Sequence, residues 1–304
     1  MDKPIFHQSA IKLYSICPKQ YWFLKVAGVK RETISSKMLF GSVYHEAVDQ
    51  LHQGVVVDEA CLREIIDTIE KAEETPTWWD DRQAEIDEWL LDAVPTLNNY
   101  WSKPFNREAK ILLSEKEFTV KIGSFDFAGR IDQVRQTPEG ELVLIDYKSG
   151  LMPNGEAEFE LDYQLSIYAY ALKHDTTLGI ERFPDKVGRY LLHDHLPYKR
   201  NGKKGDGTPY FKGNERGNGL YTTTRTEADY DAMIQDLSII CRQIVGPHFN
   251  AKTNRLESGG AFPRTPNFLN CGMCPVRQEC IDDRRANIIQ QPINVELTEE
   301  DFVV

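Results

Sequence analysis

The sequence lacks any apolar run close to the ~18–20 residues that a membrane-spanning helix requires. It opens with Met-Asp-Lys-Pro, without the charged and apolar regions of a signal peptide. It also lacks the glycine-rich Walker A loop that ends in lysine, so no nucleotide-driven motor is evident. We therefore expect a soluble, cytoplasmic protein that has no membrane partner and no motor of its own.

Cysteine is scarce, with six in 304 residues. Thiols stay reduced in the cytosol, so clustered cysteines indicate a metal site rather than disulfides. Cys271 and Cys274 form a C-x-x-C pair that can bind one metal centre, and Cys280 supplies a third ligand and Cys17 a fourth. Thiolate chemistry permits either a four-cysteine zinc site or an iron–sulfur cluster. Structural cysteines without a metal are the remaining alternative.

The chain also lacks the excess of positive charge that is typical of nucleic-acid-binding proteins, because its net charge is −11. Residues 58–92 account for most of this charge, with 13 acidic and 3 basic side chains. Residues 1–53 are basic instead, with 7 basic and 4 acidic side chains, and residues 195–219 carry 6 basic and 2 acidic ones. The acidic segment predicts a solvated helical insertion packed by tryptophans. A tryptophan platform for stacking bases is less favoured, because the surrounding charge repels phosphate.

The spacing of apolar residues predicts the secondary structure. We expect a helix capped by Ser9, a helix over Ser35–Gln53, helices in 58–102 that Pro95 kinks or breaks, a helix over Glu160–His174, and a long helix from Thr226 that buries Cys241. Strands are expected over Lys110–Phe118, Val120–Val134, Leu142–Gly150, Lys186–His193 and Tyr221–Thr224. We expect residues 195–219, with six glycines, to form a basic flap over a nucleic-acid backbone, and His52 to lie at the surface.

Two carboxylates lie on neighbouring predicted strands. Asp146 and Lys148 are two residues apart at the end of an apolar strand, so both side chains project to one face. Asp132 lies near the end of the preceding strand, and the turn at 137–140 predicts a hairpin that brings Asp132 close to Asp146. Two such carboxylates repel each other unless a cation separates them, and oxygen ligands suit Mg²⁺ or Mn²⁺. The alternative is that Asp146 simply pairs with Lys148.

Four short motifs follow one another in a familiar order. Gly129–Asp132 (GRID) and Asp146–Lys148 (DYK) resemble the catalytic core of the PD-(D/E)XK nucleases. Gln164–Tyr168 (QLSIY) and Gly41–His45 (GSVYH) resemble the Q-x-x-x-Y and G-x-x-x-H motifs of the RecB-like branch of that superfamily. Each motif alone is weak evidence. Their order and expected local structure make the resemblance specific, and it covers most of the chain.

The resemblance implies an α/β (α+β) fold with a restriction-endonuclease-like core, in which helices flank a central mixed β-sheet. We expect a single nuclease domain over residues 1–304, with a helical insertion over 55–105. The catalytic core sheet would occupy 106–225. A helix and cysteine region over 226–282 would close onto Cys17.

The resemblance also implies the roles of the motif residues. Asp132 and Asp146 would hold Mg²⁺ or Mn²⁺, with the help of His45 and the backbone carbonyl of Tyr147. Lys148 would orient the attacking water or stabilise the transition state. Gln164 and Tyr168 would position the DNA strand. Glu115 and Glu117 on the preceding strand are further candidate ligands, but we expect both at the surface.

Iron–sulfur members of the RecB-like nucleases show the same split arrangement of one early cysteine and three late ones. The resemblance therefore implies a [4Fe–4S] cluster held by Cys17, Cys271, Cys274 and Cys280, with zinc as the rival. The cluster would tie distant parts of the chain together and so have a structural role.

The implied activity is that of a metal-dependent DNA exonuclease acting on single-stranded DNA, with some endonuclease activity in such enzymes. The stand-alone exonucleases of CRISPR adaptation are the most similar, and enzymes of recombination and repair, phage-encoded ones included, share these features. A helicase or an integrase would be the partner. The alternatives are a non-catalytic DNA-binding or assembly subunit that retains the fold, and an iron–sulfur redox protein with no nucleic-acid role.

Overall fold

The structure is a computed structural model. It describes residues 5–29, 35–72, 76–150, 159, 161–196, 198–203, 209–213, 219–246, 249–250, 255–256 and 262–290. The chain divides into two compact units. Unit 1 contains Met1–Gln8 and Thr33–Gly246, and unit 2 contains Ser9–Glu32 and Pro247–Val304.

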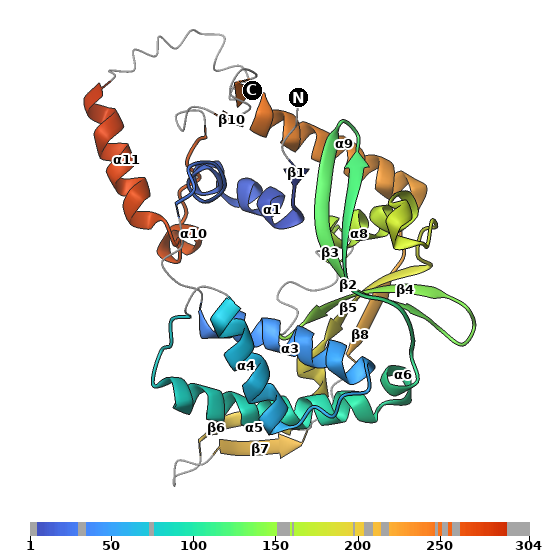
Figure 1. Cartoon of the computed structure of the whole chain (residues 1–304). Helices are drawn as coiled ribbons and strands as arrows, with labels where there is room; N and C mark the ends of the chain where they lie inside the picture. The colour runs from blue at the N-terminus through green and yellow to red at the C-terminus, as the bar shows by residue number, and fades with distance from the viewer. Residues whose placement is uncertain are drawn as a thin grey trace. The chain divides into compact units, whose positions relative to one another are not determined.

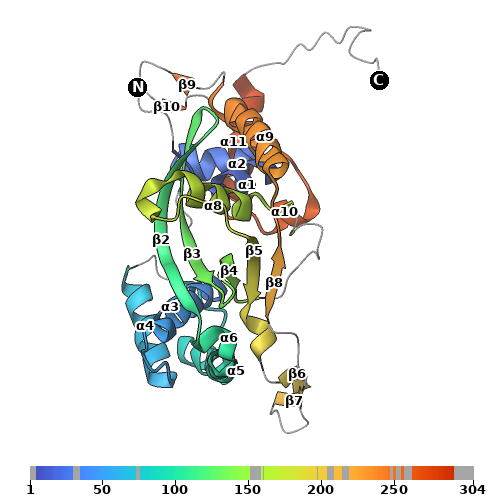
Figure 2. The same ribbon diagram turned by 90° about the vertical axis from the view of Figure 1, so that its right-hand side faces the viewer.

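A six-stranded mixed sheet forms the centre of unit 1, and its main order is β1-β3-β4-β5-β8, with β2 also paired to β3 (Figures 1 and 2). The strands are β1 (Ile5–Phe6), β2 (Lys110–Ile122), β3 (Phe125–Gln136), β4 (Leu142–Lys148), β5 (Lys186–Leu191) and β8 (Leu220–Thr223). The pairs β1–β3 and β4–β5 are parallel. The pairs β2–β3, β3–β4 and β5–β8 are antiparallel. The predicted hairpin of the two carboxylate-bearing strands, β3 and β4, is confirmed.

The long β2–β3 hairpin turns at Gly123, which has a φ of +59°. A Cβ atom at this glycine would also come within 2.7 Å of the Ser238 hydroxyl. Both the left-handed backbone and the close approach favour glycine here. Before the turn, Phe118, Val120 and Ile122 alternate with exposed polar residues, which is the pattern of a strand with one buried face.

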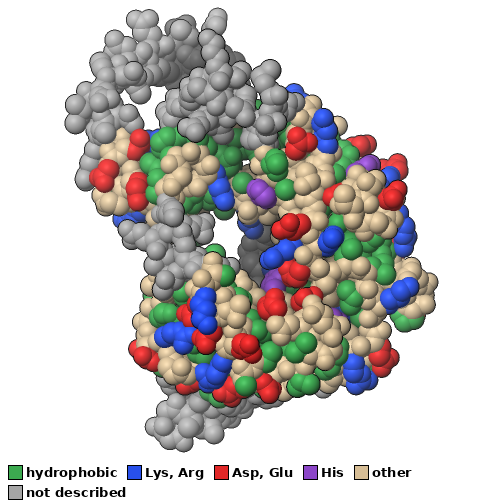
Figure 3. All heavy atoms as spheres, in the orientation of Figure 1, with side chains coloured by type: hydrophobic (Ala, Val, Ile, Leu, Met, Phe, Trp, Pro, Cys, Tyr) green, Lys and Arg blue, Asp and Glu red, His purple; other side chains and the backbone are tan. Residues whose placement is uncertain are grey.

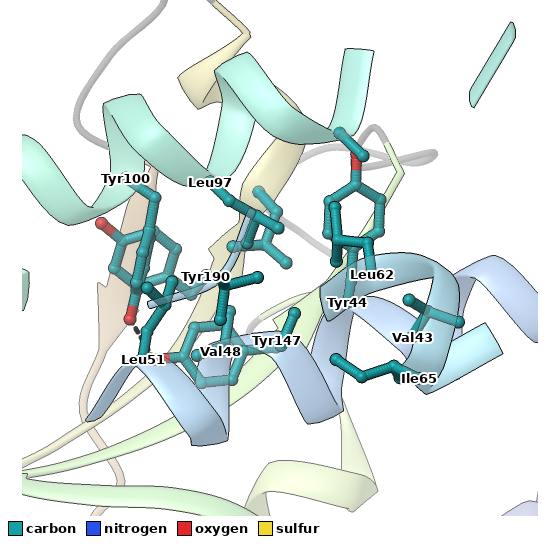
Figure 4. Close-up of a cluster of buried hydrophobic side chains, with 14 of the residues drawn as sticks. Val43, Tyr44, Val48, Leu51, Leu62, Ile65, Leu97, Tyr100, Tyr147 and Tyr190 are labelled. Carbon is teal, nitrogen blue, oxygen red and sulfur yellow. Dashed lines mark hydrogen bonds between the residues drawn. The ribbon is translucent and has the colours of Figure 1, made fainter. Parts of the chain in front are cut away.

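The central strand β4 is buried along Leu142–Tyr147, because helices cover both faces of the sheet. The helices on one face are α3 (Ser36–His52), α4 (Glu59–Ala72), α5 (Arg82–Ser102) and α6 (Pro104–Arg107). Val143, Ile145 and Tyr147 pack into the apolar cluster formed with α3, α4 and α5 (Figure 4). The other face meets α8 (Tyr163–His174), which packs on α9 (Glu227–Val245). The predicted fold class, a mixed sheet flanked by helices, is confirmed.

Helices α4 and α5 carry the acidic stretch of the chain. Basic side chains offset part of that charge in ion pairs such as Arg63–Asp87, at 2.6 Å. Acidic and basic side chains are accordingly interspersed over these helices (Figure 3). Trp89 stacks on Phe40 at 4.6 Å, as expected for an insertion packed by tryptophans. Pro95 lies inside α5 and does not end that helix.

Four local predictions need correction. The expected strand Val120–Val134 is divided by the turn at Gly123, so its first residues belong to β2 and its later ones to β3. The first helix, α1 (Gln8–Ile16), contains Ser9 instead of being capped by it. Strand β5 ends at Leu191, and the 3₁₀-helix η3 (Leu192–His195) follows it. The predicted basic loop contains an antiparallel pair, β6 (Tyr198–Lys203) and β7 (Pro209–Gly213). Aromatic residues at both sides of the glycines favour these strands over a loop.

Unit 2 joins segments that are far apart in the sequence. Its elements are α1, α2 (Pro18–Tyr21), the π-helix η1 (Trp22–Val26), β9 (Phe249–Asn250), β10 (Arg255–Leu256), α10 (Phe268–Gly272) and α11 (Arg277–Gln290). Tyr21 stacks on Phe262 with ring centroids 6.1 Å apart, and Tyr14 meets both rings edge-on. The buried Lys19 ammonium pairs with Asp283 at 2.9 Å. Unit 2 therefore has its own small core. In neither unit do the described residues form a helix that could cross a membrane.

A candidate metal centre at the end of the sheet

Asp132 and Asp146 lie side by side on one face of the sheet. Strand β3 pairs with β4 so that Gln133 is opposite Ile145, which places Asp132 opposite Asp146. Both carboxylates are buried, with Asp132 8% and Asp146 1% exposed. The backbone N–H of Tyr147 donates to Asp132 Oδ2 at 2.8 Å and fixes that side chain. The structure therefore brings the two predicted acids together.

His45 and Glu115 complete a cluster around Asp132. His45 Nδ1, from α3, lies 3.6 Å from Asp132 Oδ2 and 3.5 Å from Glu115 Oε1. The ligand atoms of these three residues all lie within 4.8 Å of one another. No other group of three or more such side chains is this compact within the described part of the chain. One imidazole and two carboxylates form a donor set that suits a divalent cation.

Glu115 belongs to this cluster, although its sequence favoured a place at the surface. Ser114 pairs with Gln133 and Lys116 with Ile131, so Glu115 faces Asp132 across the ladder. The sequence carried a signal for this pairing, because Gly123 and Ser124 form a two-residue turn between the paired residues Ile122 and Phe125. Glu115 and Asp132 are equally far from that turn. Counting back from the turn would have matched them.

The backbone of Glu115 is unusual, since its φ is +46°. Residues other than glycine rarely adopt this left-handed backbone conformation, which costs of the order of 1–3 kcal/mol. Such strain persists where the surrounding structure enforces it, often at a functional site.

Burial and mutual repulsion dominate the electrostatics of the cluster. Burial and the charge of Asp146 raise the pKa of Asp132 to about 7, and His45 acts against this. Burial also raises the pKa of Asp146, while Lys148 acts against it. Burial lowers the pKa of His45, but the hydrogen bond to Glu115 and the nearby carboxylates outweigh it, so the pKa is raised. Full ionisation of these acids requires additional positive charge, which a divalent cation would provide.

Lys148 lies on the same face as Asp146, as the strand periodicity predicts. Its Nζ is 2.8 Å from Asp146 Oδ2 and 3.0 Å from Oδ1. The lysine side chain is 40% exposed, whereas the carboxylate that it contacts is buried. The ammonium group is therefore held in place and still accessible to a substrate.

Gln164 and Tyr168 enter the site from α8. Gln164 Nε2 donates to Asp146 Oδ1 at 2.9 Å and to the Tyr168 hydroxyl at 3.0 Å. The Tyr168 ring packs edge-on against Phe118 at 5.5 Å. A Cβ at Gly129 would approach Phe118 within 2.8 Å, so the glycine leaves room for this ring pair. Gln164 thus contacts a carboxylate directly.

The Tyr147 side chain points to the opposite face of the sheet, into the helical layer (Figure 4). Its hydroxyl accepts a hydrogen bond from the fully buried Arg135 at 2.6 Å. Arg135 also donates to the Tyr100 hydroxyl at 2.7 Å. The same hydroxyl lies 2.7 Å from His52 Nε2, so His52 belongs to this polar network and the surface placement was wrong. Burial, followed by the charge of Arg135, lowers the pKa of His52 to about 3.

The cysteines with a predicted role all lie in unit 2. A cavity of about 170 Å³ is lined by Cys17, Cys271, Cys274 and Cys280. Burial raises the pKa of Cys274, and the three neighbouring thiols raise it further. In the part of the chain that the structure describes, no three of these sulfurs lie within 4.8 Å of one another. Cys241, by contrast, is buried in α9 as expected.

One protein family and several solved structures are similar to this chain. The family model described as the PD-(D/E)XK nuclease superfamily matches residues 6–281. The crystal structure of SSO0001 is similar at 12% identity, over 90% of this chain and 94% of that one, with a TM-score of 0.31. A candidate exonuclease from Eubacterium rectale is similar at 11% identity, over 88% of this chain and 92% of that one, with a TM-score of 0.38. No curated protein sequence matches the chain.

Proposed function

Since the chain belongs to the PD-(D/E)XK nuclease superfamily, a family of metal-dependent nucleases that act on DNA, we propose that it is an exonuclease that hydrolyses phosphodiester bonds in single-stranded DNA. One observation carries the proposal. Asp132, Asp146, Lys148 and His45 converge at one end of the sheet, and Glu115 joins them. The substrate strand, the exonuclease mode and the RecB-like branch go beyond the family match and rest on the motifs Gly41–His45 and Gln164–Tyr168.

The donor set fits Mg²⁺ or Mn²⁺. His45, Glu115 and Asp132 offer ligand atoms within 4.8 Å of one another, and Asp146 faces Asp132 across the ladder. We propose the backbone carbonyl of Tyr147 as a further ligand, as in the family that the motifs resemble. Such a cation, when bound, polarises the scissile phosphate and lowers the pKa of a bound water.

The chain's own residues supply the remaining chemistry. The Lys148 ammonium, steadied by Asp146, orients the attacking water or offsets the charge that develops on the phosphate. Lysine suits this role because its charge is compact and carries three donors. Burial raises the pKa of Tyr168, so its phenol stays a neutral hydrogen-bond donor beside the strand. Gln164 orients Asp146, and we propose that it also guides the strand.

We propose that unit 2 holds a [4Fe–4S] cluster through Cys17, Cys271, Cys274 and Cys280. The lining of one cavity by all four residues supports this. The described sulfurs form no compact group of three, and a four-cysteine zinc site is the rival of the cluster. The role of the cluster would be to stabilise unit 2.

We further propose that the enzyme acts in the cytoplasm in recombination, repair or CRISPR-type adaptation, in a cell or a phage, with a helicase or an integrase as partner. Residues 1–304 would act as one nuclease domain, in which 55–105 form the insertion, 106–225 the core sheet and 226–282 the cysteine-bearing region.

Cleavage assays test the proposed activity. End-labelled single-stranded DNA is incubated with Mn²⁺ and with the wild type, Asp146→Ala or Lys148→Ala. The wild type should shorten the DNA from an end, and both variants should lose the activity. Asp87→Ala and Lys186→Ala, which remove the same charges from surface ion pairs, should cleave normally. If the wild type binds DNA but never cleaves it, the chain is a non-catalytic subunit and the proposal fails.

The cofactor needs a separate measurement. Protein purified without oxygen should be brown and contain iron and sulfide. Colourless protein loaded with zinc would overturn the cluster proposal but not the nuclease proposal.

A further inference from the structure

A buried ion pair lies behind the carboxylate site and joins two elements of unit 1. Arg189 on β5 is paired in parallel register with Asp146 on β4, so the two residues are direct neighbours in the sheet. The Arg189 guanidinium forms an ion pair with Asp162, and both side chains are 8% exposed. Neither residue belongs to the motifs that the sequence analysis identified.

Asp162 uses its two carboxylate oxygens in different directions. Oδ1 accepts the backbone N–H of Gln164 at 2.7 Å, which makes Asp162 the N-cap of α8. Oδ2 accepts from Arg189 on the neighbouring strand. One side chain therefore links the first turn of α8 to β5.

This link leads directly to a carboxylate of the metal site. Gln164 is the second residue of α8, and its Nε2 donates to Asp146 Oδ1 at 2.9 Å. The position of that amide depends on where the first turn of α8 lies. Asp162 also adds negative potential at Asp146, and the Arg189 charge beside Asp162 offsets it.

A second arginine contacts the same turn through a hydroxyl and a backbone carbonyl. Arg225 donates to the Phe159 carbonyl at 3.0 Å and to the Ser166 hydroxyl at 3.0 Å. The Ser166 hydroxyl in turn donates to the Asp162 carbonyl at 3.2 Å. The start of α8 thus has additional anchors. Loss of the Arg189 contact should shift the turn and leave the helix folded.

We propose that Arg189 is a positioning residue of the nuclease site, which acts through Asp162 to hold Gln164 against Asp146. The inference rests on the proposed function for its kinetic consequences. Stability alone is a poor explanation of the pair, because the cost of desolvating two buried charges often matches their attraction. A geometric role accounts for a buried guanidinium at this place.

Metal affinity in the absence of DNA tests the proposal most directly. Arg189→Met should weaken Mn²⁺ binding, measured by calorimetry, about 10-fold, because outer-shell partners of metal ligands typically contribute 10–100-fold. The value of kcat should fall by a similar factor, while KM for DNA stays close to the wild-type value. The control is Lys186→Met, on the same strand as Arg189, which breaks an exposed ion pair with Glu141. It should change neither the Mn²⁺ affinity nor kcat.

A double-mutant cycle tests the route through Gln164. If Arg189 acts through Gln164, Arg189→Met should add little to the effect of Gln164→Ala. Additive losses would overturn the proposal, since Arg189 would then act independently. Asp162→Asn keeps a good N-cap but removes the charge, so it should match Arg189→Met. Wild-type affinity in Asp162→Asn would also contradict the proposal.

Amide hydrogen exchange separates this proposal from the proposed function. The Gln164 N–H should exchange faster in Arg189→Met than in the wild type, by more than the global stability that the variant loses in urea unfolding accounts for. That result supports the anchoring of α8 even if the wild type fails to cleave DNA, in which case the nuclease proposal alone is lost. Unchanged exchange at Gln164 would refute the anchoring itself. If Arg189→Met does not fold, the same measurements on Asp162→Asn decide the question.

Discussion

Glu115 faces Asp132 across the β2–β3 ladder, and His45 Nδ1 lies 3.5 Å from one carboxylate and 3.6 Å from the other. This relationship makes Glu115 part of the acidic cluster, although it stands outside the four motifs. Two acids from one hairpin and an imidazole from a helix thus surround a space where a cation would relieve their repulsion.

The first prediction concerns Glu115. Glu115→Gln keeps the shape of the side chain but removes its charge, so Mn²⁺ affinity should fall about 10-fold or more, as for other groups that support a metal site. Calorimetry without DNA measures the affinity, and cleavage should require correspondingly more metal. Glu117→Gln is the matched control on the same strand, where the side chain is exposed, and it should bind Mn²⁺ normally. Equal behaviour of the two variants would remove Glu115 from the site.

The pH dependence of metal binding follows from Asp132. Its pKa of about 7 means that the metal-free protein carries a proton there below neutral pH, and the metal must displace it. Mn²⁺ affinity should therefore rise with pH up to about 7, by at most about tenfold per pH unit for one displaced proton. Calorimetry in buffers of different ionisation enthalpy counts the protons released. No proton release at pH 6 would contradict this assignment.

The stability of the metal-free protein should also depend on the ionisation of Asp132, but it should fall with rising pH, whereas the Mn²⁺ affinity rises. The folded pKa of Asp132 is raised above the value of about 3.9 for an unfolded chain. The folded state therefore binds more protons, and its contribution to stability is lost as pH rises from about 4 to about 7. Urea unfolding at several pH values measures this, and Asp132→Asn should flatten that part of the profile. Added Mn²⁺ should restore stability at pH 7.

His52 should govern the acid side of the stability profile. The pKa of His52 is lowered to about 3 in the folded protein, against about 6.5 in an unfolded chain. The unfolded state binds the proton first, so stability is present above about pH 6.5 and is lost as pH falls toward about 3. His52→Gln should reduce this loss in urea unfolding. His7→Gln, which changes an exposed histidine, is the control and should keep the wild-type profile.

The cysteine cavity gives a prediction about cofactor content. Cys274→Ser should abolish the brown colour and lower the melting temperature of unit 2, because the protein would lose a ligand that supports its fold. Cys61→Ser changes a cysteine of unit 1 and should keep both the colour and the iron content. Loss of colour in both variants would point to general misfolding instead.

Local rules were enough to place Asp132, Asp146 and Lys148. The alternation of side chains along a strand and the turn after Gln136 fixed their common face. The helical spacing of Ser36–His52 likewise located the segment that carries His45.

Long-range contacts explain the misses. Glu115 requires the register of the whole β2–β3 hairpin, and the expected strand had been ended at Phe118. His52 is half-buried beside Tyr100 and Arg135, which are 48 and 83 positions away in the sequence. Arg189 carries no motif, and only the pairing of β4 with β5 places it beside Asp146. The placements of His52 and Arg189 depend on tertiary packing, which a single sequence does not reveal, whereas the register of the β2–β3 hairpin could have been counted from its turn.

Unit 2 is formed from two segments that are far apart in the sequence, and this has a consequence for biosynthesis. Its first part, Ser9–Glu32, leaves the ribosome early, but its partner segment begins only at Pro247. Cys17 therefore emerges long before Cys271, Cys274 and Cys280 exist. The sheet and its helices can fold co-translationally in the interval, because domains generally fold as units during synthesis. Loading of the proposed cluster would thus wait until Cys280 has been synthesised, and a chain released before that point would retain Cys17 without its three proposed partner cysteines.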